Sequence, residues 1–166
     1  ILPNQEIAAN AGLDVENGIK VDEFGRSSDA DIYAAGDVAF HFNPILGRHV
    51  RLESWANAQN GGIAVARNMV GEPTPYSEVP WFWSDQYDLN LQVAGVPLSW
   101  DRLVVRGDPE SGKCVIFYKM GEKVVGATSF NMGREMRFCR KLVETGREIA
   151  DSDLGDTDQS LRNLLA

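Results

Sequence analysis

The spacing of apolar residues changes near residue 75 of this 166-residue chain, and the change separates two kinds of architecture. Within residues 53–70, small and apolar side chains recur every three or four positions, which predicts an amphipathic helix. The stripe consists of Trp55, Ala58, Gly62, Ala66 and Met69. Residues 71–75, rich in Gly and Pro, end this helix and resemble a linker, and beyond them the apolar period falls to two.

The two parts predict a fold class of an α/β segment followed by an α+β domain with an antiparallel sheet and C-terminal helices. In residues 1–79 we expect short strands at 18–21 and 32–35 before the helix. In residues 80–166 we expect a meander with strands around 90–94, 103–106, 114–119 and 124–130. Two helices should follow, at 134–143 and 159–165. The first should turn Met136, Cys139 and Val143 inward.

Composition excludes several functions. The net charge of -8, without a basic block interleaved with aromatics, argues against nucleic acid as a partner. Cys114 and Cys139 lie far apart, and His41 and His49 form no metal-binding pattern, so no metal site is expected. No apolar stretch approaches the roughly 20 residues of a membrane-spanning helix. With no secretory signal at residues 1–4 either, we expect a cytoplasmic protein.

The first segment with chemical potential ends at Gly36 and Asp37. A run of small residues before Gly lets the backbone approach a ligand closely, and a carboxylate there can accept hydrogen bonds from a polyol. Val38 and Ala39 are weaker candidates, through backbone contact. The alternative is that Asp37 only caps a helix or forms a turn.

Two further segments contain tryptophan. Trp55 lies at the start of the predicted helix, where unpaired N–H groups and the helix dipole suit an electron-rich ring edge, although it could equally anchor the helix in the interior. Trp81 and Trp83 are separated by one residue and therefore point to the same side of an extended segment. One could be core and the other could cover a flat ring. Alternatively, both could belong to an aromatic core strand.

These segments resemble the FAD-dependent ferredoxin reductases of oxygenase systems. Residues 26–37 are similar to that family's RTSxPDIYAAGD segment, residues 51–59 to RLESWxNAQ, and residues 80–88 to PWFWSDQYD, a signature of the putidaredoxin reductase and biphenyl or toluene dioxygenase reductase group. The resemblance implies that Asp37 binds the ribityl part of FAD, that Trp55 lies against the flavin ring, and that Trp83 lies beside the isoalloxazine.

The resemblance also implies what lies elsewhere. No GxGxxG fingerprint is present, so the adenine-binding strand of the FAD domain and the NADH domain are expected upstream. Residues 1–79 would then be the C-terminal segment of the FAD domain, and residues 80–166 the reductase C-terminal domain. The HxxxxxE pair of disulfide reductases is absent, which argues against lipoamide dehydrogenase or glutathione reductase chemistry.

By resemblance, the complete enzyme passes electrons from NADH through FAD to a 2Fe–2S ferredoxin, and no catalytic acid, base or nucleophile is required of this chain. The chain alone is expected to be inactive. The alternative function is a non-catalytic docking or dimerisation module, and a homodimer is compatible with either reading. A basic stretch could contact an acidic ferredoxin or simply be a solvated helix face. It comprises Arg134, Arg137, Arg140, Lys141 and Arg147.

Overall fold

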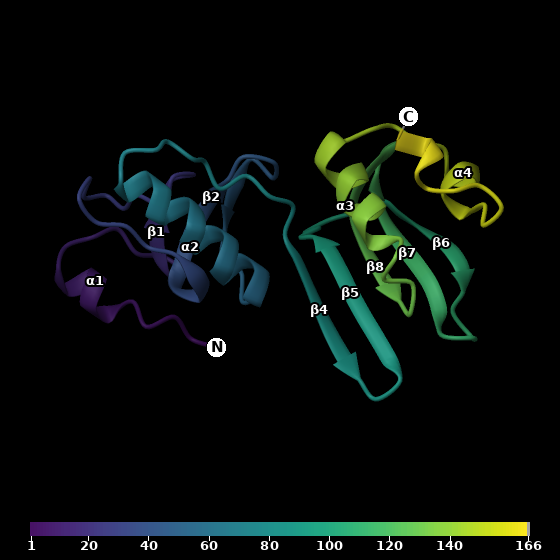
Figure 1. Cartoon of the computed structure of the whole chain (residues 1–166), viewed down its shortest axis with the longest axis horizontal. Coiled ribbons are helices and arrows are strands. Elements are labelled where there is room, and N and C mark those ends of the chain that lie inside the picture. The colour runs from purple at the N-terminus through teal and green to yellow at the C-terminus, as the bar shows by residue number, and fades with distance from the viewer. Residues whose placement is uncertain (166) are drawn as a thin grey trace. The chain divides into compact units, whose positions relative to one another are not determined.

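The computed structural model describes residues 1–165, and the chain divides into two compact units, Ile1–Glu78 and Val79–Ala166. Each unit contains its own sheet (Figure 1). None of the helices in the part that the structure describes is long and apolar enough to cross a membrane.

The first unit contains a three-stranded sheet and two α-helices. Its elements are α1 (Glu6–Asn10), β1 (Ile19–Val21), the short 3-10 helix η1 (Gly36–Val38), β2 (Ala39–Asn43), β3 (Arg48–Val50) and α2 (Trp55–Met69). β2 lies in the middle of the sheet, parallel to β1 and antiparallel to β3. Its residues alternate between buried and half-buried, because successive side chains of a strand point to opposite faces. The expected strand at 18–21 is confirmed as β1.

Helix α2 (Trp55–Met69) lies within the predicted range 53–70. The Ser54 side chain accepts a hydrogen bond from the Asn57 backbone N–H at 3.2 Å, which caps the first turn. The predicted stripe, however, does not pack within this unit: Trp55 is 66% exposed and Met69 is also exposed. The buried side carries Asn57, Gly61 and Ala64, whose small or hydrogen-bonded side chains allow close packing. The prediction of the helix was right, and the interior-anchor reading of Trp55 was wrong.

The predicted strand at residues 32–35 is not formed. The segment makes only an isolated bridge between Arg26 and Tyr33, and Ile32 is exposed. The segment's hydrogen bonds run back to its own loop, from Ser27 N to the Ile32 carbonyl and from Ala34 N to the Gly25 carbonyl. A strand requires a neighbouring ladder, and among residues 1–165 no other strand lies alongside this segment.

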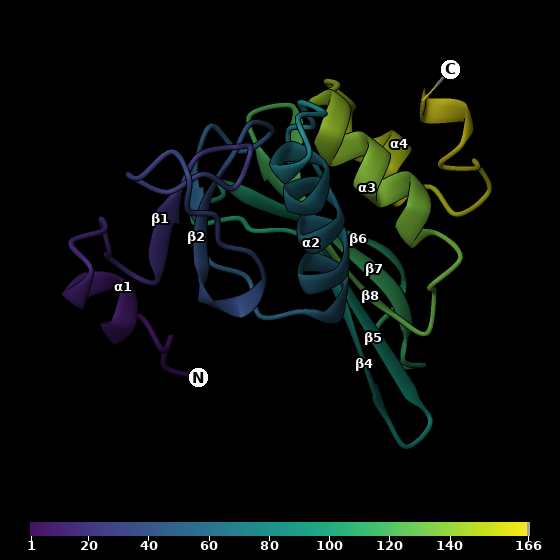
Figure 2. The ribbon, with the colours of Figure 1, turned by 60° about the vertical axis from the view of Figure 1, so that its left-hand side comes forward.

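The second unit is an antiparallel sheet with helices on one face (Figure 2). Its elements are β4 (Trp81–Gln86), β5 (Leu89–Gly95), β6 (Arg102–Asp108), β7 (Lys113–Met120), β8 (Lys123–Phe130), α3 (Met136–Thr145), α4 (Asp151–Gly155) and η2 (Asn163–Leu165). The strand order is β4-β5-β8-β7-β6. The predicted fold class is confirmed. The simple meander was only partly right, because β5 pairs with β8 rather than with β6.

Helix α3 packs on β5 and β8, and Met136, Cys139 and Val143 are buried as predicted. The C-terminal helix was predicted too long, since only Asn163–Leu165 is helical there. Helix α4 was not predicted, because its five residues are mostly polar and Leu154 is its single buried side chain. So short a segment carries no readable helical period.

Two buried cations attach the C-terminal segment to the sheet. Lys119 on β7, with no exposed side-chain surface, donates to the Ile149 carbonyl at 2.5 Å and to Asp151 Oδ1 at 2.6 Å. Arg106 on β6 donates to the carbonyls of Leu154, Asp156 and Gln159. Buried charges are tolerated only when paired and hydrogen-bonded, so these contacts fix the position of α4 and the loop after it.

Candidate cofactor site

The turn around Asp37 begins with a glycine in a left-handed conformation. Ala35 is extended, Gly36 has φ +76°, and the chain then makes the single turn η1 before Ala39 starts β2. A Cβ atom placed on Gly36 would lie 4.0 Å from the Ala58 Cβ of α2. Glycine is therefore needed for its backbone angle rather than for lack of space. The turn packs against the start of α2, which brings Gly36, Asp37 and Val38 together with that helix.

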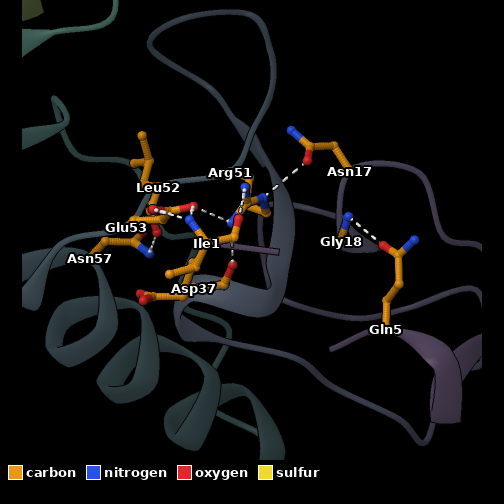
Figure 3. Close-up of polar contacts among 9 residues, drawn as sticks. All are labelled: Ile1, Gln5, Asn17, Gly18, Asp37, Arg51, Leu52, Glu53 and Asn57. Carbon is orange, nitrogen blue, oxygen red and sulfur yellow. Dashed lines mark hydrogen bonds and ion pairs between the residues drawn. The ribbon is translucent and has the colours of Figure 1, made fainter. Parts of the chain in front are cut away.

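The Asp37 carboxylate is available to a ligand. The side chain of Arg51 contacts the main chain of Asp37 instead: its Nη1 donates a hydrogen bond to the Asp37 backbone carbonyl at 3.3 Å. Figure 3 shows the carboxylate pointing away from Arg51. Within residues 1–165 it forms no hydrogen bond or ion pair. A half-buried carboxylate without a partner is a strong acceptor for a hydroxyl group.

Arg51 lies at the centre of a polar cluster that the sequence analysis did not identify. Its side chain is 11% exposed and donates to Asn17 Oδ1 at 3.1 Å and to Glu53 Oε1 at 2.7 Å (Figure 3). The hydrogen bond from Arg51 is the main reason why the pKa of Glu53 lies below its usual value. The signal was present, since Arg51 opens the RLESW segment, but sequence alone did not indicate its contacts.

Gly18 makes room for this cluster. A Cβ atom on Gly18 would lie 2.5 Å from the Val38 carbonyl oxygen and 3.1 Å from Arg51 Cδ. Its backbone φ of +120° also disfavours other residues, and its N–H donates to Gln5 Oε1 at 2.7 Å (Figure 3). Position 18 must therefore be glycine for the Asp37 turn and the Arg51 side chain to approach each other.

The first turn of α2 lies next to this turn and contains backbone N–H groups without an intrahelical partner. Ser54 caps one of the first N–H groups, while a helix leaves four of them without an intrahelical partner. The Asn57 side chain is buried and donates to the Leu52 carbonyl at 3.0 Å, which fixes the segment entering the helix (Figure 3). Trp55, at the first helical position, presents its indole at the surface.

A small cavity of about 20 Å³ lies behind the turn. Its lining includes Ala35, Gly36, Asn57 and His41. His41 is buried, and its Nε2 has no hydrogen-bond partner among the described residues. Burial, and to a smaller extent the nearby His49, lowers the pKa of His41 to about 4. The imidazole is therefore neutral near pH 7.

In the second unit, Trp81 and Trp83 share one face of the edge strand β4. Their rings stack with centroids 4.9 Å apart and an interplanar angle of 28°. Trp81 Nε1 donates to Gln92 Oε1 at 3.2 Å, and the Arg140 guanidinium lies over the Trp81 ring at 5.3 Å. Trp81 is half-buried and Trp83 is 39% exposed. The reading of both residues as an aromatic core strand is wrong, because neither indole is fully buried.

Comparison with known proteins assigns the chain to a family. Residues 81–165 match the family described as "Reductase C-terminal", and residues 1–62 match "Pyridine nucleotide-disulphide oxidoreductase". The chain belongs to the reductase C-terminal family. The position of the first match within the second unit agrees with the antiparallel sheet and α3 found there.

Relatives of this reductase chain extend the assignment. It is 45% identical to the anthranilate 1,2-dioxygenase system ferredoxin–NAD(+) reductase component of Burkholderia cepacia, over 99% of this chain and 41% of that protein. It is 40% identical to rhodocoxin reductase of Rhodococcus erythropolis, over 100% of this chain and 39% of that protein. The predicted resemblance to ferredoxin reductases of oxygenase systems is confirmed, and the chain spans about 40% of the length of these relatives.

A solved structure of a ferredoxin reductase has the same fold as this chain. In the covalent putidaredoxin reductase–putidaredoxin complex, the matching chain is 32% identical and superposes with a TM-score of 0.93, over 99% of this chain and 39% of that one. The reductase family thus has the fold described above, in both units.

Proposed function

We propose that this chain forms the flavin-ring side of the FAD site in an NAD(P)H-dependent ferredoxin reductase. The complete protein would take electrons from NADH, bound by an upstream domain, and deliver them to a 2Fe–2S ferredoxin of an oxygenase system. Residues 1–79 would be the end of the FAD domain, and residues 80–166 the reductase C-terminal domain. The proposal fits the family to which the chain belongs and the names of its relatives.

The observation that carries this proposal is the Asp37 carboxylate, which has no partner in the part of the chain that the structure describes and is mounted on a glycine turn beside the open end of α2. These residues fit FAD. Asp37 would accept a hydrogen bond from a ribityl hydroxyl, and Gly36, Val38 and Ala39 would offer backbone contacts. Ala39 is itself buried, so only its main chain is suited to this role.

The aromatic residues would contact the ring system. Trp55 would lie against the flavin, with the positive end of α2 near its pyrimidine edge, and Trp83 would lie beside the isoalloxazine. Bound FAD would supply hydride acceptance and single-electron release. The chain's own residues would bind and orient the cofactor and exclude water. We assign no acid or base role to any residue of this chain. His41 is buried and neutral near pH 7, which agrees with this assignment.

The ferredoxin partner is supported by the relatives' names, and its docking surface stays a proposal. Several members of the basic stretch, which begins just before α3 and ends just after it, already have partners. Arg137 lies over the Phe138 ring, Lys141 pairs with Glu144, and Arg147 donates to the Leu164 carbonyl. These contacts favour a structural role for much of the stretch, and leave Arg134 as its best candidate for an acidic partner.

The test uses the full-length protein that contains this chain. It should purify with oxidised flavin absorbance or acquire it with added FAD, and it should reduce a 2Fe–2S ferredoxin with NADH. A full-length protein that neither binds FAD nor consumes NADH would contradict the proposal. That result would favour the docking or dimerisation module, for which the exposed stripe of α2 is the supporting observation.

A further inference from the structure

The Arg51 guanidinium joins three segments that are distant in sequence. It donates to Asn17 Oδ1 before β1, to the Asp37 carbonyl in η1, and to Glu53 Oε1 before α2 (Figure 3). A fourth donation reaches the Ile1 carbonyl at 3.3 Å. Since a guanidinium is planar and presents its donors in fixed directions, four acceptors define its orientation closely.

This orientation has a consequence for Asp37. An arginine this close to an aspartate would ordinarily pair with the carboxylate, which would remove that carboxylate from use by a ligand. Here the charge of Arg51 is matched by Glu53 at 2.7 Å instead, and Arg51 binds the Asp37 main chain. The Asp37 carboxylate is left pointing away (Figure 3).

We infer that Arg51 is a positioning residue for the flavin site: it anchors the Asp37 turn by its carbonyl and keeps the carboxylate free for the cofactor. This inference rests on the proposed function, in which Asp37 binds FAD. Gly18 supports it, because a side chain there would push against both the Val38 carbonyl and the stem of Arg51. Glu53 and Asn17 act with Arg51 by fixing the direction of its donors.

The test measures FAD dissociation from the full-length protein by the fluorescence of released flavin. Arg51→Met should raise the dissociation constant about tenfold, the effect typical of losing one hydrogen bond to a charged group. Arg51→Lys should restore only part of the lost affinity for FAD, since an ammonium supplies the positive charge without the planar set of donors that a guanidinium presents. Asn17→Ala keeps Arg51 and should weaken binding by a smaller factor, so the inference can be tested even if Arg51→Met folds poorly. Arg67→Met, an exposed arginine of the same unit, is the matched control.

The double variant Arg51→Met with Asp37→Ala tests whether Arg51 affects FAD binding through Asp37 or independently of it. If Arg51 acts through Asp37, the pair should bind FAD no more weakly than Asp37→Ala alone. Additive losses, or full restoration by Arg51→Lys, would overturn the inference, because either would show an independent or purely electrostatic effect. If Asp37→Ala itself leaves FAD binding unchanged, it is the proposed site that fails. If Asp37→Ala weakens binding while Arg51→Met behaves like Arg67→Met, only the positioning role is wrong.

Discussion

The indoles of Trp81 and Trp83 stack on each other at the edge of the sheet, and Trp81 also donates to Gln92 Oε1 and lies under the Arg140 guanidinium. In the full-length protein, Trp83→Ala should alter flavin fluorescence and slow electron transfer to ferredoxin, with a small change in melting temperature. Trp81→Ala should lower the melting temperature more, because Trp81 is the more buried of the two and its loss removes the hydrogen bond to Gln92 and the cation–π contact with Arg140.

Both outcomes are measured on the same preparations, by flavin emission and thermal unfolding. Because the rings stack, the double variant should lose less stability than the sum of the two single variants. If Trp83→Ala unfolds the protein while Trp81→Ala perturbs only the flavin, the roles of the two tryptophans are reversed.

Asp37→Ala should weaken FAD retention in the full-length protein by about 1.5 to 3 kcal/mol, the typical contribution of a hydrogen bond to a charged group. Flavin content after extensive dialysis checks this. Asp31→Ala removes the same charge from an exposed position in the same segment and should leave flavin content unchanged. Equal flavin retention by both variants would reduce Asp37 to a turn-forming residue.

Lys119→Met should destabilise the second unit by about 3 kcal/mol, because it removes the cation shared by Asp151, Glu122 and the Ile149 carbonyl. The loss should appear in thermal unfolding and as faster hydrogen exchange in residues 149–165. Lys113→Met, at an exposed position on the same strand, should change neither. An unchanged exchange rate in Lys119→Met would show that Lys119 is not needed to hold this segment, to which Arg102, Arg106 and Arg147 also donate hydrogen bonds.

His41 predicts a pH dependence of stability. Because the folded pKa of about 4 lies below the ordinary value of 6.5, the unfolded chain binds the proton first as pH falls. The stability is therefore complete above pH 6.5 and declines between 6.5 and about 4, by up to about 3 kcal/mol. His41→Phe should remove this decline in denaturant unfolding, whereas His49→Phe, at the half-buried neighbouring histidine, should retain most of it. If the free energy of unfolding falls equally steeply with pH in the wild type and in His41→Phe, His41 is not the group responsible for the decline.

Patterns among neighbouring residues predicted most of the local elements and indicated the family. The three-to-four spacing before residue 70 and the alternation of the later strands are properties of neighbouring residues, and the structure contains the helix α2 and the antiparallel sheet that they predict. The motifs around Asp37, Trp55 and Trp81 indicated the reductases in the same way.

Contacts between residues that lie far apart in the sequence could not be predicted from local patterns. The pattern of α2 indicates two faces but not which is buried, and the side with Gly61 and Ala64 packs inward because small residues permit close approach. The segment at 32–35 has strand composition but lacks a neighbour to pair with. Arg51 and Asn17, 34 positions apart, meet at Asp37 because the turn at Gly18 and the start of α2 converge there, a geometry that local spacing does not encode.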